Sequence, residues 1–295
     1  MLVDTFLEYL LLERNYSEKT IVNYKKDLEE FEAFFKDEDL DCKWETVDAD
    51  IVRQWAVELM SPPQNCKPAS VNRKLSTLRT FYKFLLSRDV VLVDPMRKIR
   101  GPKKNKVLPV FVKESQMEDL LNKSDFGKDF MGIRNKLIIE MFYETGIRRA
   151  ELISLNDMDV DLDLKNIKVI GKRNKQRIIP FGSELYEEIN EYLDVRNETL
   201  GDDCESFFVN KKGKRISAND VYTIVKRELS KVVTLKKCSP HVLRHTFATA
   251  MLNNQAELVA IKELLGHKSL STTTIYTNTT FEKLKKVYKQ AHPRA

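Results

Sequence analysis

Cysteine patterns and long apolar runs are both missing from this chain of 295 residues, and each absence excludes a class of protein. The four cysteines stand at positions 42, 66, 204 and 238 without Cys-x-x-Cys or Cys/His spacing. We therefore expect neither a disulfide framework nor a metal site. No apolar stretch is long enough to span a membrane. The first residues also lack the basic start and cleavage site of a secretory signal, which favours a cytoplasmic protein without membrane contact.

The composition is that of an ordinary globular protein, with 42% hydrophobic and 32% charged residues. A chain of this length can bury a substantial core and more readily forms two domains than one. No internal repeat or low-complexity segment is visible. We therefore expect two folded domains, without a repeat architecture or a long disordered region.

The net charge of +6 conceals an uneven distribution. Residues 1–60 hold 7 Lys and Arg against 16 Asp and Glu, whereas residues 61–107 hold 12 against 2. A concentrated basic stretch of this kind suits a polyanion that is followed along its backbone. A solvated helix face explains the charge alone equally well.

Residues 1–94 are predicted to form a helical bundle, because apolar residues recur there at helical spacing. The last of four expected helices begins near Pro68, a residue suited to a first helical turn. Its polar positions give candidates for phosphate or groove contact, with ordinary surface charge as the alternative. These DNA-binding candidates are Asn72, Arg73, Arg79 and Lys83.

Residues 95–109 are predicted to be a basic linker. Three prolines and one glycine disfavour regular structure, and six basic residues favour contact with phosphates. Lys103 and Lys104 are the DNA-binding candidates in this segment. A linker of this kind would let two domains close around a duplex as a clamp.

Residues 110–295 are predicted to form an α+β domain. Helices surround a strand–turn–strand pattern, in which residues 166–170 and 176–180 are the strands. The expected fold class is therefore mainly α with a small β-sheet. It is a two-domain clamp, with an N-terminal helical bundle and a C-terminal α+β catalytic domain.

Six residues of the second domain suit cleavage of a phosphodiester without a metal or a nucleotide cofactor. Guanidinium groups can neutralise the non-bridging oxygens through paired hydrogen bonds, imidazoles can move protons, and a phenol can attack phosphorus. The candidate catalytic residues are Arg148, Lys172, His241, Arg244, His267 and Tyr276.

Local sequence indicates how several of these side chains are held. Gly146 interrupts a helix, so Arg148 should fall in the first turn of the next one, where Glu151 can support it or cap the helix. His241 and Arg244 have i, i+3 spacing and therefore share one helix face.

Two assignments stay open from residue types alone. The turn of the expected hairpin holds Lys172, Arg173 and Lys175, and any of these cations could protonate the departing 5′ oxygen. Tyr276 is the candidate nucleophile, yet a single tyrosine is far more often a buried core residue.

Five ordered motifs resemble the tyrosine recombinase (phage integrase) family, and most closely its Xer branch. The first is Thr-Gly-Ile-Arg-Arg-Ala-Glu-Leu around Arg148, and the second is the hairpin Gly-Lys-Arg-Asn-Lys-Gln-Arg-Ile-Ile-Pro. His-Val-Leu-Arg-His-Thr-Phe-Ala-Thr, Leu-Leu-Gly-His-Lys-Ser and Tyr276 follow in order. The resemblance covers about residues 108–295, and residues 1–95 look like the helical core-DNA-binding domain of that family.

The resemblance implies a site-specific DNA recombinase that cleaves and rejoins strands through a 3′-phosphotyrosyl intermediate. It makes Tyr276 the nucleophile, selects Lys172 as the hairpin acid, and implies no cofactor. Arg173 departs from the glycine usual in that turn and, with Lys175, is a DNA-binding candidate. The implied partners are double-stranded DNA with a specific recombination site and a homo- or hetero-tetramer. A second recombinase and a septal DNA translocase are further candidate partners.

Xer-like resolution of chromosome dimers, linked to cell division, is the preferred function. A compact length with no arm-binding domain before residue 1 favours it over an integrase of a phage or mobile element. A type IB topoisomerase uses similar residues, and a non-cleaving architectural DNA-binding protein is the alternative of another class. The sequence leaves open the target DNA sequence, and whether the helix expected at 281–291 docks on its own domain or on a neighbouring subunit.

Overall fold

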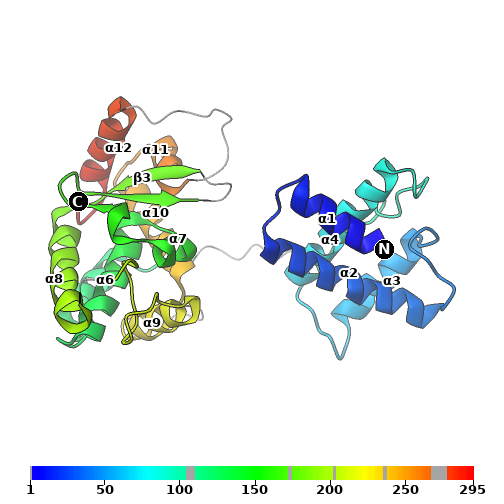
Figure 1. Ribbon diagram of the computed structural model, residues 1–295, viewed down its shortest axis with the longest axis horizontal. Coiled ribbons are helices and arrows are strands. Elements are labelled where there is room, and N and C mark those ends of the chain that lie inside the picture. The colour runs from blue at the N-terminus through cyan, green and yellow to red at the C-terminus, as the bar shows by residue number, and fades with distance from the viewer. Residues whose placement is uncertain (1, 104–109, 172–174, 202–203, 235–237, 267–277) are drawn as a thin grey trace. The chain divides into compact units, whose positions relative to one another are not determined.

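The computed structural model describes residues 2–103, 110–171, 175–201, 204–234, 238–266 and 278–295, with the backbone alone over 278–283. The chain divides into two compact units, residues 1–107 and 108–295. Figure 1 shows helices in both units and strands in the second. The expected fold class, mainly α with a small β-sheet, is confirmed.

The first unit is a bundle of helices around an aromatic core. Its helices are α1 (Leu2–Leu12), α2 (Glu18–Glu38), α3 (Ala49–Met60) and α4 (Pro68–Ser87). Asp48 caps α3 by accepting hydrogen bonds from the backbone amides of Asp50 and Ile51. Phe31 and Trp55 have their ring centroids 4.8 Å apart in the centre of this core.

The beginning of the segment expected to be a linker packs on this bundle. Met96 and Ile99 are buried in its core. Two α4 side chains also bind the backbone of this segment. Asn72 Nδ2 donates to Pro102 O at 2.8 Å, and Arg79 Nη2 donates to Ile99 O at 3.2 Å. The chain therefore leaves the bundle later than the sequence suggests, since apolar side chains between the basic ones are covered.

The second unit surrounds one helix of which nearly every residue is buried. The elements before the sheet are α5 (Glu114–Glu118), the π-helical turn η1 (Asp119–Lys123), α6 (Phe130–Thr145), α7 (Arg149–Ser154) and the 3₁₀ turn η2 (Asp157–Asp159). Those after it are α8 (Ser183–Leu200), α9 (Ala218–Ser230), α10 (Pro240–Asn253), α11 (Leu258–Leu265) and α12 (Asn278–Ala291). The central helix is α6, which packs against α8, α9 and α10.

The sheet has three antiparallel strands in the order β1-β2-β3. They are β1 (Val160–Asp161), β2 (Asn166–Ile170) and β3 (Gln176–Pro180). Ile170 pairs with Gln176 where β2 and β3 meet, which confirms the predicted hairpin. Along β3, Arg177 and Ile179 are both buried, because alternate residues of a strand face the same side.

The C-terminal helix α12 packs on its own unit. Leu284 and Tyr288 are buried with Phe247 and Leu265, from α10 and α11. Beyond α12, the His292 ring stacks on Tyr288 at 5.2 Å and is buried, which lowers the pKa of His292 to about 4. Within the single chain, α12 therefore docks on its own domain.

Arg294 joins this C-terminal segment to buried carboxylates of α6. Its Nη2 lies 2.6 Å from Glu140 Oε1, its Nε lies 3.7 Å from Glu144 Oε1, and it also pairs with Glu184. Burial raises the pKa of Glu140 to about 7 and the pKa of Glu144 well above its ordinary value. Among the described residues, the carboxylates of Glu140, Glu144 and Glu184 form the one acidic cluster whose oxygens lie close enough together to hold a metal ion. Arg294 is paired with each of these carboxylates.

Replacement of Arg294 by methionine is expected to destabilise the second unit by about 3–5 kcal/mol, because it leaves buried carboxylates without their cation. The free energy of unfolding from urea titration at pH 8 measures this loss. The loss should shrink near pH 5, because the folded-state pKa of Glu140 is raised and its carboxyl is then protonated.

Lys289 supplies the control, since it lies on the exposed side of α12. Its replacement by methionine should change stability by no more than about 0.5 kcal/mol. Equal losses from the two variants would contradict the role given to Arg294.

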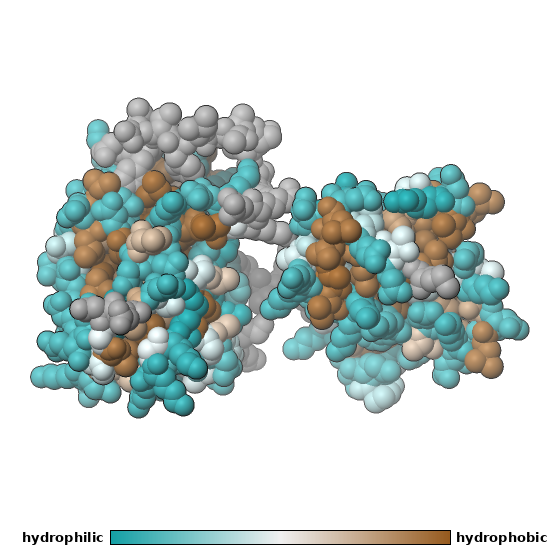
Figure 2. Space-filling model, viewed as in Figure 1, coloured by the Kyte–Doolittle hydropathy of each residue, from teal (hydrophilic) through white to brown (hydrophobic). Residues whose placement is uncertain are grey.

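The surfaces of both units are mainly hydrophilic on the face seen in Figure 2, with smaller hydrophobic areas between the polar ones. Leu12, Leu92 and Val93 are among the exposed apolar residues of the first unit. No helix in the described ranges is both long and apolar enough to cross a membrane.

Candidate active site

The position of Arg148 follows from the glycine that ends α6. Gly146 has a left-handed backbone, with φ of +59°, and a Cβ atom there would lie 2.6 Å from Phe247 Cδ1. The chain therefore turns sharply, and Arg148 becomes the N-cap residue of α7, one position before the first turn that the sequence suggests. The side chain is held at a bend and is partly exposed.

Glu151 joins two arginines that are distant in sequence. Its Oε1 accepts from Arg148 Nη1 at 2.7 Å, and its Oε2 accepts from the Arg148 amide at 2.8 Å. The same two oxygens accept from Arg177 Nη1 and Nη2 at 2.7 and 2.8 Å. Burial alone would raise the pKa of Glu151, but hydrogen bonds and charge from Arg177 and Arg148 lower it to about 2. The carboxylate is therefore ionised at any working pH, and it both supports Arg148 and caps the helix.

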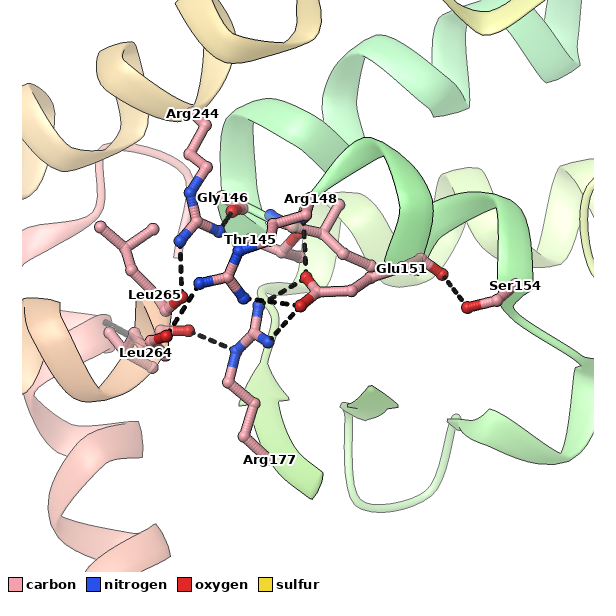
Figure 3. A network of polar contacts seen from close by, with 11 residues as sticks. Thr145, Gly146, Arg148, Glu151, Ser154, Arg177, Arg244, Leu264 and Leu265 are labelled. Atoms are coloured by element: carbon pink, nitrogen blue, oxygen red, sulfur yellow. Dashed lines mark hydrogen bonds and ion pairs between the residues drawn. The ribbon is translucent and has the colours of Figure 1, made fainter. Parts of the chain in front are cut away.

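Three consecutive backbone carbonyls at the end of α11 each bind a different arginine (Figure 3). Leu264 O accepts from Arg177 Nε at 2.8 Å, Leu265 O accepts from Arg244 Nη2 at 2.5 Å, and Gly266 O accepts from Arg148 Nη2 at 2.8 Å. The last carbonyls of a helix have no partner within the helix, so these guanidinium groups satisfy them.

Arg244 reaches this cluster from α10. Its Nη1 donates to Gly146 O, so its guanidinium lies between the ends of α6 and α11. Burial and the nearby charges of Arg148 and Arg177 lower the pKa of Arg244 to about 9, which still leaves it charged at neutral pH. Two of the three guanidinium groups pair with Glu151, and Arg244 binds only backbone carbonyls. The resulting excess of positive charge suits an anionic phosphate.

His241 lies one turn before Arg244 on α10 and is exposed. Partial burial, followed by the charges of Arg149, His245 and Arg244, lowers the pKa of His241. The neutral imidazole is therefore favoured near neutral pH, which is the form that accepts a proton.

Five of the residues predicted from sequence lie outside the described residues. They are Lys104, Lys172, Arg173, His267 and Tyr276. The structure brings together Arg148 and Arg244 and describes His241 on the same helix as Arg244.

The described DNA-binding candidates differ in how far they are already engaged. Arg73 pairs with buried Asp27 through both terminal nitrogens, yet about half of its side chain is exposed. Lys83, Lys103 and Lys175 are exposed. Asn72 and Arg79 hold the 99–102 segment, as described above, so any contact of these two with DNA would be additional to a structural role.

Arg177 is the residue of this cluster that sequence reasoning missed. It is 95% buried, with 5% of its side chain exposed. A signal was present, because Arg177 alternates with Ile179 on the inward face of β3. A charged residue at an inward strand position needs a buried partner, and Glu151 supplies it.

Comparison with known families matches residues 110–283 to the phage integrase family. Residues 3–89 match the N-terminal SAM-like domain of phage integrases. The tyrosine recombinase XerC of Staphylococcus epidermidis is 40% identical over 292 residues, which cover 99% of this chain and 97% of that protein.

Solved structures share the fold. The integrase of transposon Tn1549, in complex with circular intermediate DNA, has a TM-score of 0.73 at 18% identity, covering 96% of this chain and 99% of that one. The XerH recombinase bound to a palindromic difH substrate has a TM-score of 0.70 at 23% identity, covering 92% of this chain and 80% of that one.

Proposed function

Because this chain belongs to the phage integrase family of tyrosine recombinases, we propose that its arginine cluster activates one DNA phosphate for attack by Tyr276. The chain is a site-specific recombinase of the Xer type, an enzyme that cleaves and rejoins DNA strands. Its 40% identity with a XerC protein over nearly the full length favours this function over that of a phage or mobile-element integrase. The same identity favours a recombinase over a topoisomerase and over a non-cleaving architectural protein.

One observation carries the proposed chemistry. Arg148 and Arg244 donate to the adjacent carbonyls of Gly266 and Leu265, so their guanidinium groups approach the same point. The cluster holds three guanidinium groups and one carboxylate, Glu151, which pairs with Arg148 and Arg177, so it keeps enough positive charge to neutralise a phosphate.

The remaining roles follow from the family and from the chemistry of each group. His241 exchanges a proton at the phosphate, and His267, directly after Gly266 in sequence, donates a hydrogen bond to it. Lys172 protonates the 5′ oxygen as it leaves. Tyr276 forms the 3′-phosphotyrosyl bond as the 5′ oxygen departs, and the freed 5′ hydroxyl of a partner strand then displaces the tyrosine. The phosphoester energy is retained, so no nucleotide is needed.

We propose double-stranded DNA with a specific recombination site as the substrate, bound by a tetramer of recombinase subunits. The XerH structure was determined on a difH substrate, and the Tn1549 integrase on a DNA intermediate. Exposed Lys83, Lys103 and Lys175 supply phosphate contacts, together with Lys104 and Arg173. Resolution of chromosome dimers in the cytoplasm, with a second recombinase and a septal DNA translocase as further partners, is the cellular role we propose.

A nicked suicide substrate tests the proposal. A duplex selected by the protein from a random-sequence pool is nicked close to the cleaved bond, so that the short cleaved fragment diffuses away. We expect a covalent protein–DNA adduct on a denaturing gel, formed equally with and without EDTA and without added nucleotide. A protein that binds the duplex tightly but never yields an adduct would contradict strand cleavage.

A further inference from the structure

We propose that Arg177 is a positioning residue of the strand-cleavage site, which fixes Glu151 and, through it, the guanidinium of Arg148. This inference rests on the proposed function and adds to it a residue that does not itself touch the DNA. Arg177 lies on β3, Glu151 on α7, and the carbonyl of Leu264 at the end of α11. One side chain therefore connects the strand after the hairpin turn to two other parts of the site.

Each of the three guanidinium nitrogens of Arg177 donates a hydrogen bond. Nη1 and Nη2 donate to the two oxygens of Glu151 at 2.7 and 2.8 Å, and Nε donates to Leu264 O at 2.8 Å. The planar fork of a guanidinium holds a carboxylate in one orientation, which a lysine ammonium cannot do. Arg177 thereby holds the Glu151 carboxylate in the orientation in which it also accepts a hydrogen bond from Arg148 Nη1.

Arg177 also shapes the turn that follows α11. Gly266 has φ of +62°, and a Cβ atom there would lie 3.2 Å from Arg177 Cδ and 3.3 Å from its Nη1. The backbone that carries Gly266 O to Arg148 therefore packs directly on the Arg177 side chain. Loss of Arg177 would therefore remove support from both partners of Arg148, the Glu151 carboxylate and the Gly266 carbonyl.

The charge of Arg177 has a second consequence for Glu151. The charged groups that face this buried carboxylate are Arg148 at the start of α7, Arg177 on β3 and Arg244 on α10. Without Arg177, burial favours the protonated carboxyl, and its pKa rises from the present value of about 2. Arg148 then loses its anionic partner as the pH falls.

The test compares Arg177→Met and Arg177→Lys with the wild-type chain on the nicked suicide duplex. We expect DNA affinity to be unchanged and the single-turnover rate of adduct formation to fall about 100-fold. A small displacement of a reacting group is enough to cause a rate loss of this size. The rate deficit of Arg177→Met should grow as the pH is lowered from 8 to 6. Arg177→Lys should recover part of the rate and remove this pH dependence, because it restores the charge but not the fork.

Arg196 provides a matched control in the same unit. It is 2% exposed, and its Nη1 and Nη2 donate to Asp157 at 2.8 and 2.7 Å, so it is also a buried arginine held by a carboxylate. Arg196→Met should lower the unfolding free energy while cleavage by the folded protein stays within a few-fold of wild type. Equal rate losses in Arg177→Met and Arg196→Met would overturn the proposal.

A double substitution identifies the route of the effect. In an Arg148→Lys background, removal of Arg177 should cost only a few-fold further, because the side chain that it positions is already gone. A full 100-fold loss in that background would show that Arg177 acts independently of Arg148 and would overturn the proposal. Wild-type protein that forms no adduct would instead count against the proposed function itself, so the two failures are distinguishable.

Discussion

Tyr276→Phe is expected to abolish covalent adduct formation and recombination while DNA binding stays at the wild-type level. The substitution removes one oxygen atom, the proposed nucleophile, and keeps the aromatic ring. A phenol has an ordinary pKa of about 10, so it needs a cationic neighbourhood to attack at neutral pH. In the proposed mechanism, the charge excess of Arg148, Arg177 and Arg244 supplies that neighbourhood.

Adduct on the suicide duplex is measured by denaturing gel, and binding by gel shift on the intact duplex. Tyr222 gives the matched control, because it is exposed on α9 in the same unit and offers the same phenol. Tyr222→Phe should form adduct at the wild-type rate. An adduct with Tyr276→Phe would assign the nucleophile to another residue.

Arg244→Met is expected to lower the single-turnover cleavage rate by about 10²–10³-fold, the range for loss of one donor aimed at developing charge. Arg244 lies between Gly146 O and Leu265 O and has no carboxylate of its own among the described residues. Its positive charge is therefore available to the phosphate. Binding of the duplex should weaken only modestly, because the charge on the non-bridging oxygens is greatest in the transition state.

Two further variants separate charge from geometry. Arg244→Lys keeps the charge but loses the paired donors, so we expect it to recover only a minor part of the rate. Arg215→Met is the control, since Arg215 donates to the carbonyls of Ile153 and Leu155 outside the cluster. A rate loss with Arg215→Met as large as with Arg244→Met would indicate a general defect of the domain.

Elements whose sequence signals lie within a few residues of one another were predictable from the sequence. The β2–β3 hairpin, α4 beginning at Pro68 and the bend at Gly146 each follow from spacing, proline or glycine placement within a few residues. The end of the N-terminal bundle was less predictable, because burial of Met96 and Ile99 depends on α4 and not on their own basic surroundings.

The sequence by itself determined the fold class and the order of the chemical groups, including the arginines at 148 and 244. Only the tertiary structure decided that Arg177 joins them and that the carbonyls of Leu264, Leu265 and Gly266, at the end of α11, bind three arginines. It also decided that Arg294 neutralises carboxylates of α6 from the far end of the chain. The physical reason is that a buried charge needs a partner of opposite sign or a hydrogen-bonding group nearby in space, whereas sequence patterns report only neighbours along the chain.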